Sequence, residues 1–190
     1  MKTKIFLFIA LLLFTLNMQA QHKKFTFHSL IQAGLLEGEQ GSALQLQTIN
    51  GIKYKAWLAG IGIGVDYYHT RSIPLFLDVR KAFCGNEKTA FVYASGGYNF
   101  PWLTTTNKQN FITGATGGLY YDAGVGFELP VLKGQHLFFS AGYSAKYLTT
   151  TQQTWIYIDY VWPGPSTASD YKLQYHYSLQ RISIKAGLRF

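Results

Sequence analysis

Apolar and polar residues alternate along most of this 190-residue sequence. Alternation with a period of two predicts β-strands with one apolar face, and after residue 20 no segment of useful length shows the period of an α-helix. Glycine, asparagine, proline and threonine residues separate the alternating segments. The pattern predicts eight strands, at about residues 24–36, 42–49, 52–69, 73–83, 89–100, 117–130, 136–150 and 171–190.

The two faces of these strands differ in the size of their side chains. In the third predicted strand, Ile61 and Ile63 lie on one face, while Gly62 and Gly64 lie on the other. Glycine weakens a strand interior, so its repetition on one face indicates restricted space there. The interior of an eight-stranded barrel is only just wide enough for side chains. The sequence therefore predicts an all-β, eight-stranded antiparallel up-and-down barrel, with glycine facing the lumen and an apolar exterior suited to a membrane.

Eight charged residues within the predicted strands fall on the face opposite the apolar one. An unpaired buried charge is costly, so we expect these residues to form ion pairs that fill the lumen. Four carboxylates and four cations predict a neutral network, and a proton or ion path along the same residues is the alternative. The predicted lumen network consists of Asp66, Asp78, Arg80, Asp122, Glu128, Arg181, Lys185 and Arg189.

The connections between the predicted strands alternate in length. Asn50-Gly51 is a two-residue hairpin signal, and segments 85–88 and 131–134 are also short, whereas 101–116 and 151–170 are the longest. Membrane barrels have short periplasmic turns and longer external loops, so this order places the long connections outside the cell. The aromatic residues that we expect at the outer interface are Tyr67, Tyr68, Tyr98, Phe100, Trp102, Tyr143 and Tyr147.

The seventh connection contains an aromatic segment that is a candidate for binding an extracellular partner. Its aromatic residues are Trp155, Tyr157, Tyr160 and Trp162. Exposed apolar surface often marks an interaction site, and an exposed strand edge can pair with a partner strand. The segment can extend the last two strands as a sheet that projects from the cell. Alternatively, its rings lie at the headgroup level or pack over the barrel mouth.

The last predicted strand changes parity. Its apolar residues are odd-numbered from Leu173 to Leu179 and even-numbered from Ile182 onward. A β-bulge near Gln180 would produce this change. A bend where the strand leaves the membrane would produce it equally well.

The first twenty residues have the pattern of a cleaved secretory signal peptide. Lys2 and Lys4 precede an apolar run that is too short to span a bilayer, and Ala20 is a small residue at the expected cleavage position. Cleavage leaves one domain, residues 21–190, and lowers the net charge from +8 to +6. The single cysteine, Cys84, cannot form an internal disulfide. The basic residues are scattered, which argues against nucleic-acid binding.

The C-terminal strand carries the most specific pattern in the chain. Ile182, Ile184, Ala186, Leu188 and Phe190 are apolar and alternate with polar or small residues. This strand resembles the closing strand of the small eight-stranded outer-membrane β-barrel proteins of Gram-negative bacteria. The resemblance implies that Phe190 is the signal for the barrel-assembly machinery, and that the protein is a monomer in contact with outer-membrane lipid and lipopolysaccharide.

Signals for catalysis are weak. His176 and Ser178 resemble the His-x-Ser of the outer-membrane lipid A 3-O-deacylases, but Leu179 replaces the asparagine of that family and no acidic residue follows. His136 and Ser140 are about 13 Å apart on a strand, too far for a nucleophile and its base. No spacing of histidine, cysteine and aspartate predicts a metal site, and we expect no cofactor.

These patterns favour a non-enzymatic outer-membrane protein with a structural or adhesive role through segments 101–116 and 151–170. Three alternatives remain, because a barrel fold does not determine an activity. They are a lipid A-modifying enzyme, a narrow channel, and a secreted lipocalin-like barrel that binds an apolar ligand inside.

Overall fold

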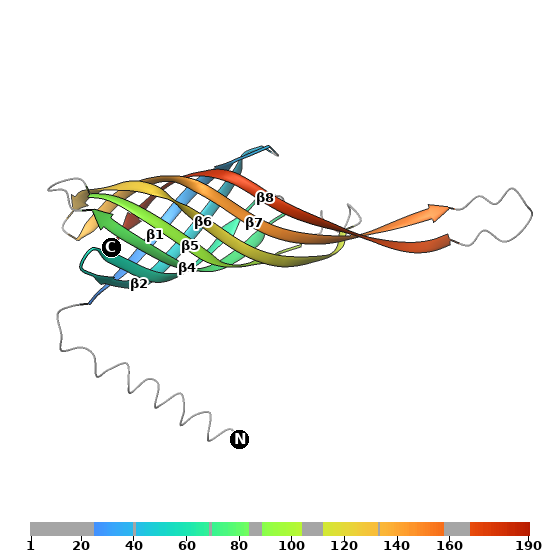
Figure 1. The fold of residues 1–190 in the computed structure, drawn as a ribbon, viewed down its shortest axis with the longest axis horizontal. Helices are drawn as coiled ribbons and strands as arrows, with labels where there is room; N and C mark the ends of the chain where they lie inside the picture. The colour runs from blue at the N-terminus through green and yellow to red at the C-terminus, as the bar shows by residue number, and fades with distance from the viewer. Residues whose placement is uncertain are drawn as a thin grey trace, which may run out of the picture.

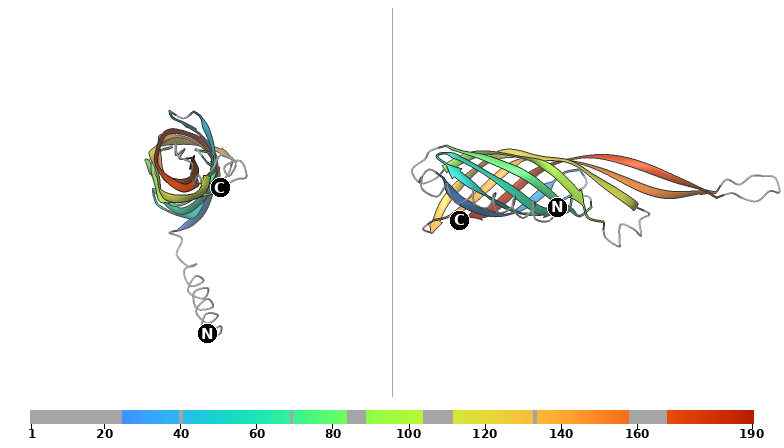
Figure 2. Two further views of the ribbon diagram at one scale, coloured as in Figure 1. Left: turned by 90° about the vertical axis from the view of Figure 1, so that its right-hand side faces the viewer. Right: turned by 90° about the horizontal axis from the view of Figure 1, so that it is seen from below.

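The computed structural model describes residues 25–39, 41–68, 70–83, 89–103, 112–132, 134–157 and 168–190, which form a closed antiparallel β-barrel (Figure 1). Each strand pairs with its neighbours along the chain, and β1 pairs with β8 to close the ring, which is visible end-on in Figure 2. The eight predicted strands are therefore confirmed. Their bounds are β1 Thr26–Glu37, β2 Ala43–Tyr54, β3 Trp57–Asp66, β4 Ser72–Phe83, β5 Thr89–Pro101, β6 Ile112–Leu132, β7 Gln135–Tyr157 and β8 Ala168–Arg189.

Burial alternates along the strands as the sequence predicts. In β3, Ile61 and Ile63 are 61% and 48% exposed, whereas Gly62 and Gly64 are buried. Successive side chains of a strand point to opposite faces, so the register fixes which residues line the lumen. The glycine-bearing face is the inner one, and the apolar face forms the exterior.

The β2–β3 turn differs from the predicted one. Asn50 and Gly51 lie inside β2, and Lys55-Ala56 forms the turn, with Lys55 at a left-handed φ of 54°. A Cβ atom on Gly51 would lie 2.0 Å from the carbonyl oxygen of Ala59. Close packing of β2 against β3, rather than a turn, therefore requires glycine at this position.

Large aromatic side chains of the lumen lie directly over glycines. A Cβ atom on Gly62 would lie 2.3 Å from the ring of Phe76, and one on Gly126 would lie 2.4 Å from the ring of Phe91. Absence of a side chain on one strand thus makes room for a ring from another strand. This pairing explains why the inner face repeats glycine.

β7 and β8 continue beyond the other strands as a two-stranded ribbon, which we define as residues 153–157 and 168–172 (Figure 1). The pairing of β8 with β1 begins only at Ile182, and the pairing of β7 with β6 ends at Gln152. The pairing of β7 with β8 nevertheless continues to Tyr157 and Ala168. The predicted seventh loop is therefore shorter than expected, because both strands extend into it.

Of the two explanations for the change of parity in the last strand, the β-bulge near Gln180 is wrong. β7 and β8 pair one to one along their whole length, and the register shifts in this part of the barrel lie between β6 and β7. Leu179 is buried and lies on the same face as Arg181. The parity of β8 is constant, and its inner face becomes apolar at the mouth of the barrel.

Several sequence predictions fall outside the described residues. They are the signal peptide at 1–20, the connection at 85–88, and the candidate binding residues Tyr160 and Trp162. Trp155 and Tyr157 belong to the ribbon backbone. The part of the chain that the structure describes contains no helix long and apolar enough to cross a membrane.

Candidate functional site: a polar network that fills the barrel

All eight ionic residues predicted for the lumen lie inside the barrel. Seven of them are buried, with exposed fractions from 0% for Asp66 and Asp122 to 9% for Arg189, and the side chain of Glu128 is 12% exposed. These residues belong to β3, β4, β6 and β8. Their contacts therefore cross the lumen and connect distant strands.

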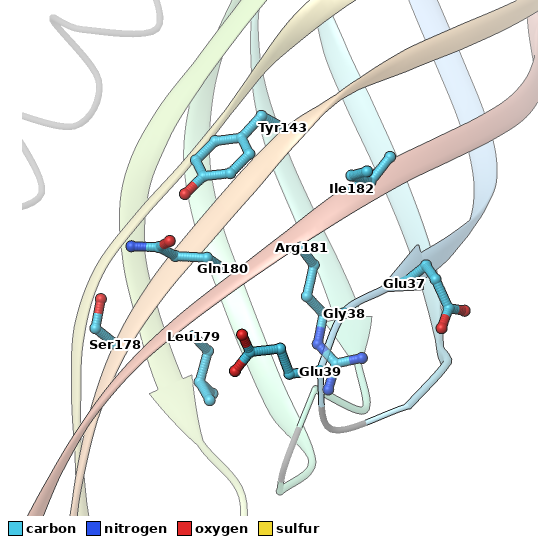
Figure 3. A pocket seen from close by; sticks show the side chains of 9 residues that line it. All are labelled: Glu37, Gly38, Glu39, Tyr143, Ser178, Leu179, Gln180, Arg181 and Ile182. Atoms are coloured by element: carbon cyan, nitrogen blue, oxygen red, sulfur yellow. The ribbon is translucent and has the colours of Figure 1, made fainter.

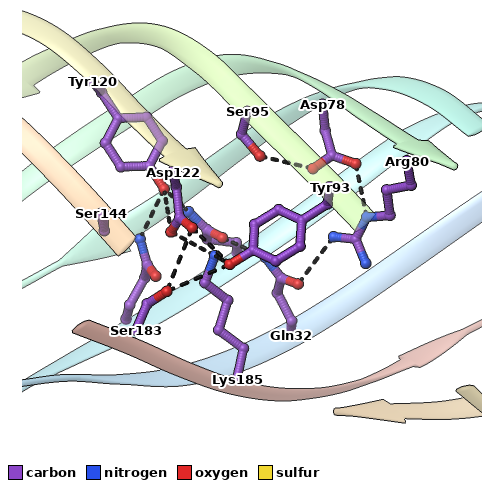
Figure 4. Close-up of polar contacts among 12 residues, drawn as sticks. Gln32, Asp78, Arg80, Tyr93, Ser95, Tyr120, Asp122, Ser144, Ser183 and Lys185 are labelled. Carbon is purple, nitrogen blue, oxygen red and sulfur yellow. Dashed lines mark hydrogen bonds and ion pairs between the residues drawn. The ribbon is translucent and has the colours of Figure 1, made fainter. Parts of the chain in front are cut away.

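Asp122 is the centre of the network (Figure 4). Lys185 Nζ lies 2.5 Å from Asp122 Oδ2, and the Tyr93 hydroxyl donates to Oδ1 at 2.7 Å. The hydroxyls of Tyr120 and Ser183 also donate to this carboxylate, both at 3.4 Å. Inside a protein, such charge-assisted hydrogen bonds are stronger than neutral ones. One carboxylate thus joins side chains of β5, β6 and β8.

A second ion pair joins the same network through two glutamines. Arg80 Nε lies 2.8 Å from Asp78 Oδ1, and Arg80 Nη2 donates to the Gln32 side chain at 3.2 Å. Gln32 donates to Gln47 at 2.5 Å, and Gln47 donates to the Tyr120 hydroxyl at 3.0 Å. The two ion pairs are therefore ends of one continuous chain of hydrogen bonds.

Lys146 forms a third buried ion pair that the sequence analysis missed. Its Nζ lies 2.5 Å from Asp66 Oδ1 and donates to Ser72 at 2.7 Å, and the side chain is 1% exposed. The signal for it was present, because Lys146 has the same parity as the lumen residues Ser140 and Ser144. The predicted charge balance was wrong as well: with Lys146, the described lumen holds five cations and four carboxylates.

Tyr68 lies inside the mouth, not at the outer interface as predicted. It is 3% exposed, and its ring centroid lies 4.1 Å from Lys146 Nζ and 5.0 Å from the guanidinium carbon of Arg181. Arg181 donates to the carbonyls of Tyr68 at 2.6 Å, Leu36 at 3.3 Å and Gly41. Among the described residues, Arg181 is the lumen cation that has no carboxylate partner. Backbone carbonyl oxygens accept its hydrogen bonds instead.

The end of the barrel at which β8 ends is also filled. Arg189 Nε donates to Glu128 at 2.7 Å, and His136 Nδ1 lies 3.0 Å from the same carboxylate. Between this pair and the central network, Phe91 and Phe138 pack around Arg80. The internal hollow that remains there measures about 10 Å³, roughly the smallest space that holds one water molecule. This part of the lumen is packed.

A hollow of about 420 Å³ lies at the rim from which the ribbon projects, where β8 passes the segment that follows β1 (Figure 3). Ser178 lines this hollow, whereas His176 does not. His176 Nδ1 lies 3.0 Å from the Thr149 hydroxyl, and no ion pair between His176 and a carboxylate is present in the described residues. The residues that line the hollow are Glu37, Gly38, Glu39, Tyr143, Ser178, Leu179, Gln180, Arg181 and Ile182.

The barrel exterior is apolar around the whole ring. This distribution is the reverse of a soluble lipocalin-like barrel, which has a wet exterior and an apolar pocket. Aromatic residues occupy the rims, with Tyr98, Phe100 and Trp102 on one side and Trp57 and Phe83 on the other. Exposed apolar residues between the rims include Ile31, Leu35, Leu44, Leu46, Ile61, Ile63, Leu75, Leu77, Leu119, Val125, Ile182 and Ile184.

A solved structure shares this architecture. A crystal structure of neisserial surface protein A matches with a TM-score of 0.52, 88% of this chain and 96% of that chain being covered at 12% sequence identity. The fold is that of a small up-and-down β-barrel. No family model matches the sequence, and no curated protein matches it. Within the described residues, no group of three or more histidine, cysteine, aspartate or glutamate side chains is placed to hold a metal ion.

Proposed function

We propose that this protein is an integral outer-membrane barrel with a structural or adhesive role at the cell surface. The observation that carries the proposal is the apolar exterior around a filled polar lumen, because this arrangement suits a lipid environment. The matched solved structure is that of a surface protein, which supports the same location. The partners that we propose are outer-membrane lipid, lipopolysaccharide and the barrel-assembly machinery, with the barrel itself a monomer.

The ribbon supports a role outside the cell. It lies at the end of the barrel opposite the C-terminal end of β8, and Trp155 and Tyr157 lie on its distal part. The connections at the other end are short, as the Lys55-Ala56 turn shows, and short turns are typical of the periplasmic side. We therefore propose that the ribbon projects from the cell and presents residues 155–162 to a partner.

Membrane insertion is tested by heat modifiability of the protein in outer-membrane fractions. A folded barrel runs as a compact, fast band before boiling and as a slower band afterwards. A band of one mobility in a soluble fraction would contradict the proposal.

Adhesion is tested by replacing residues 155–170 with Asn-Gly, a hairpin turn that closes the ribbon after Thr154. Cells that produce this variant should keep the heat-modifiable barrel and lose attachment to coated surfaces. Attachment equal to that of cells with the intact protein would leave only the structural role.

A non-enzymatic role is part of the proposal. The contact of His176 with Thr149, instead of with a carboxylate, supports it because a Ser-His pair requires an orienting acid. His176→Ala should leave the acylation of lipid A unchanged in mass spectra. A filled lumen likewise disfavours a channel, so planar-bilayer recordings should show no discrete conductance steps.

A further inference from the structure

Arg71 lies at the barrel rim from which the ribbon projects, in the connection between β3 and β4. Its guanidinium carbon lies 5.2 Å from the ring centroid of Tyr67 and 5.1 Å from that of Trp102. Both rings are about half exposed, at 50% and 48%. The backbone N–H of Trp102 donates to the Arg71 carbonyl at 2.8 Å, and that of Tyr67 donates to Leu44 at 3.2 Å. The barrel therefore fixes the two rings that hold the cation.

The charge of Arg71 is not neutralised by the described part of the protein. No carboxylate there forms an ion pair with it. The lumen cations differ, because Arg80, Lys146 and Lys185 each lie within 2.8 Å of a carboxylate oxygen. A rim cation left unpaired in this way is available to an anion from outside the chain.

The outer surface between this cation and the middle of the barrel is apolar. Leu75 on β4 is 46% exposed, and Tyr98 and Phe100 on β5 are 40% and 49% exposed, with their rings 5.1 Å apart. In a membrane, such a surface contacts acyl chains, and the rings at the rim lie at the level of the headgroups. Arg71 is thus placed at the depth where lipid phosphate groups lie.

We propose that Arg71, held between Tyr67 and Trp102, binds the phosphate group of a membrane lipid whose acyl chains pack on β4 and β5. Guanidinium presents paired N–H donors in a planar fork that matches phosphate oxygens, and it tolerates stacking on aromatic rings. The inference rests on the proposed function, since it requires a membrane around the barrel. At the outer leaflet, the ligand is a phosphorylated glycolipid.

The opposite rim provides a matched control. Lys81 Nζ lies 5.2 Å from the ring centroid of Trp57 and 5.8 Å from that of Phe83, so it too is a cation beside two rim rings. Lysine is a point charge without the paired donors of arginine. Substitution of Lys81 therefore removes the same charge from the rim that does not take part in the proposed site.

The test uses the purified barrel in detergent micelles and native mass spectrometry to count bound lipid. Diphosphoryl lipid A is titrated beside the same lipid from which both phosphates have been removed. The intact protein should bind the phosphorylated lipid about tenfold more tightly, and Arg71→Gln should abolish that preference because its charge-assisted bonds are lost. Arg71→Lys should give an intermediate affinity, and Lys81→Gln should bind like the intact protein.

Three outcomes would overturn the inference. They are an unchanged preference in Arg71→Gln, an equal loss in Lys81→Gln, and displacement of the lipid by millimolar inorganic phosphate, which would assign the site to the free anion. Heat modifiability of each preparation separates this inference from the proposed function. A folded barrel that is indifferent to Arg71→Gln contradicts the phosphate site alone, whereas a chain that never forms a barrel contradicts both.

Discussion

Two buried ion pairs in this barrel join strands that are far apart in the sequence. Lys146 on β7 pairs with Asp66 at the end of β3, and Asp122 on β6 pairs with Lys185 on β8. Removing one member of such a pair leaves an uncompensated charge, which is far more destabilising than removing both members. The pairs therefore link strands that share no backbone hydrogen bonds.

Lys146→Met should lower the free energy of unfolding by about 3–5 kcal/mol, because it leaves the buried Asp66 carboxylate unpaired. Adding Asp66→Leu should recover a large part of this loss. Urea unfolding of the refolded barrel in lipid vesicles measures both changes in a double-mutant cycle. Lys172→Met is the control, since that lysine is exposed on the ribbon. If the losses of unfolding free energy from Lys146→Met and Asp66→Leu simply add in the double variant, the result would contradict the pairing.

Gly62→Val should destabilise the barrel by about 1–3 kcal/mol, because the new side chain overlaps the Phe76 ring that lies over this glycine. Phe76→Leu should relieve the clash in the double variant. Gly96→Ala is the matched control, because an added Cβ there meets no atom within 4 Å. Equal urea midpoints for Gly62→Val and Gly96→Ala would show that the ring is free to move away.

Which side of the barrel each residue faces could be predicted from alternation alone, and all eight predicted ions are inside. Lys146 and Tyr68 were missed for different reasons. Lys146 belongs to a strand whose inner face is otherwise small or uncharged, and Tyr68 follows an outward Tyr67 directly, so it points inward by parity. The partners of each ion could not be predicted, because they depend on the stagger between non-adjacent strands, which the local pattern does not encode.

At the scale of the element, strand ends were harder to predict than strand number. The tract Thr149–Thr154 is polar on both faces, so alternation ends there, yet the β7–β8 pairing continues to Tyr157. Backbone hydrogen bonds between two antiparallel strands do not require an apolar face. For the same reason Asn50-Gly51, a strong turn signal, is accommodated inside β2 once the register of β3 is set.

The ribbon should contribute little to the stability of the barrel, because two strands without a core are only marginally stable. Replacing residues 155–170 with Asn-Gly should change the urea midpoint of the barrel by less than the substitution Gly62→Val does. Limited proteolysis offers a second readout, since cuts in the intact protein should fall in the ribbon and leave a heat-modifiable core. A large loss of barrel stability on trimming would show that the ribbon packs back onto the mouth.

At the scale of the whole molecule, closure depends on the pairing of β1 with β8. Phe190 takes part directly, because its N–H donates to the Ser29 carbonyl at 2.8 Å and its carbonyl accepts from the Ser29 N–H at 3.2 Å. The side chain is 45% exposed on the outside of the barrel. Backbone closure and the predicted recognition of the ring by the assembly machinery can therefore be tested separately.

Phe190→Ala should keep both backbone hydrogen bonds and remove only the ring. If the ring is the assembly signal, this variant should refold in detergent like the intact protein, while its heat-modifiable form in cells falls severalfold. Deletion of Phe190 should impair both, since the seam also loses its last pair of hydrogen bonds. Normal accumulation of Phe190→Ala in the outer membrane would show that the machinery does not read the ring.

The order of the strands also has a consequence for the time course of folding. Seven of the eight strand pairs are hairpins between neighbours in the chain, but Leu30 on β1 pairs with Arg189 on β8. The entropy of closing so long a loop grows only slowly with its length, so the delay is mainly kinetic. Until β8 arrives, the nascent sheet has two open edges and an apolar face, the combination that aggregates most readily. The most vulnerable species of this protein is therefore the chain that has seven strands in place and awaits the eighth.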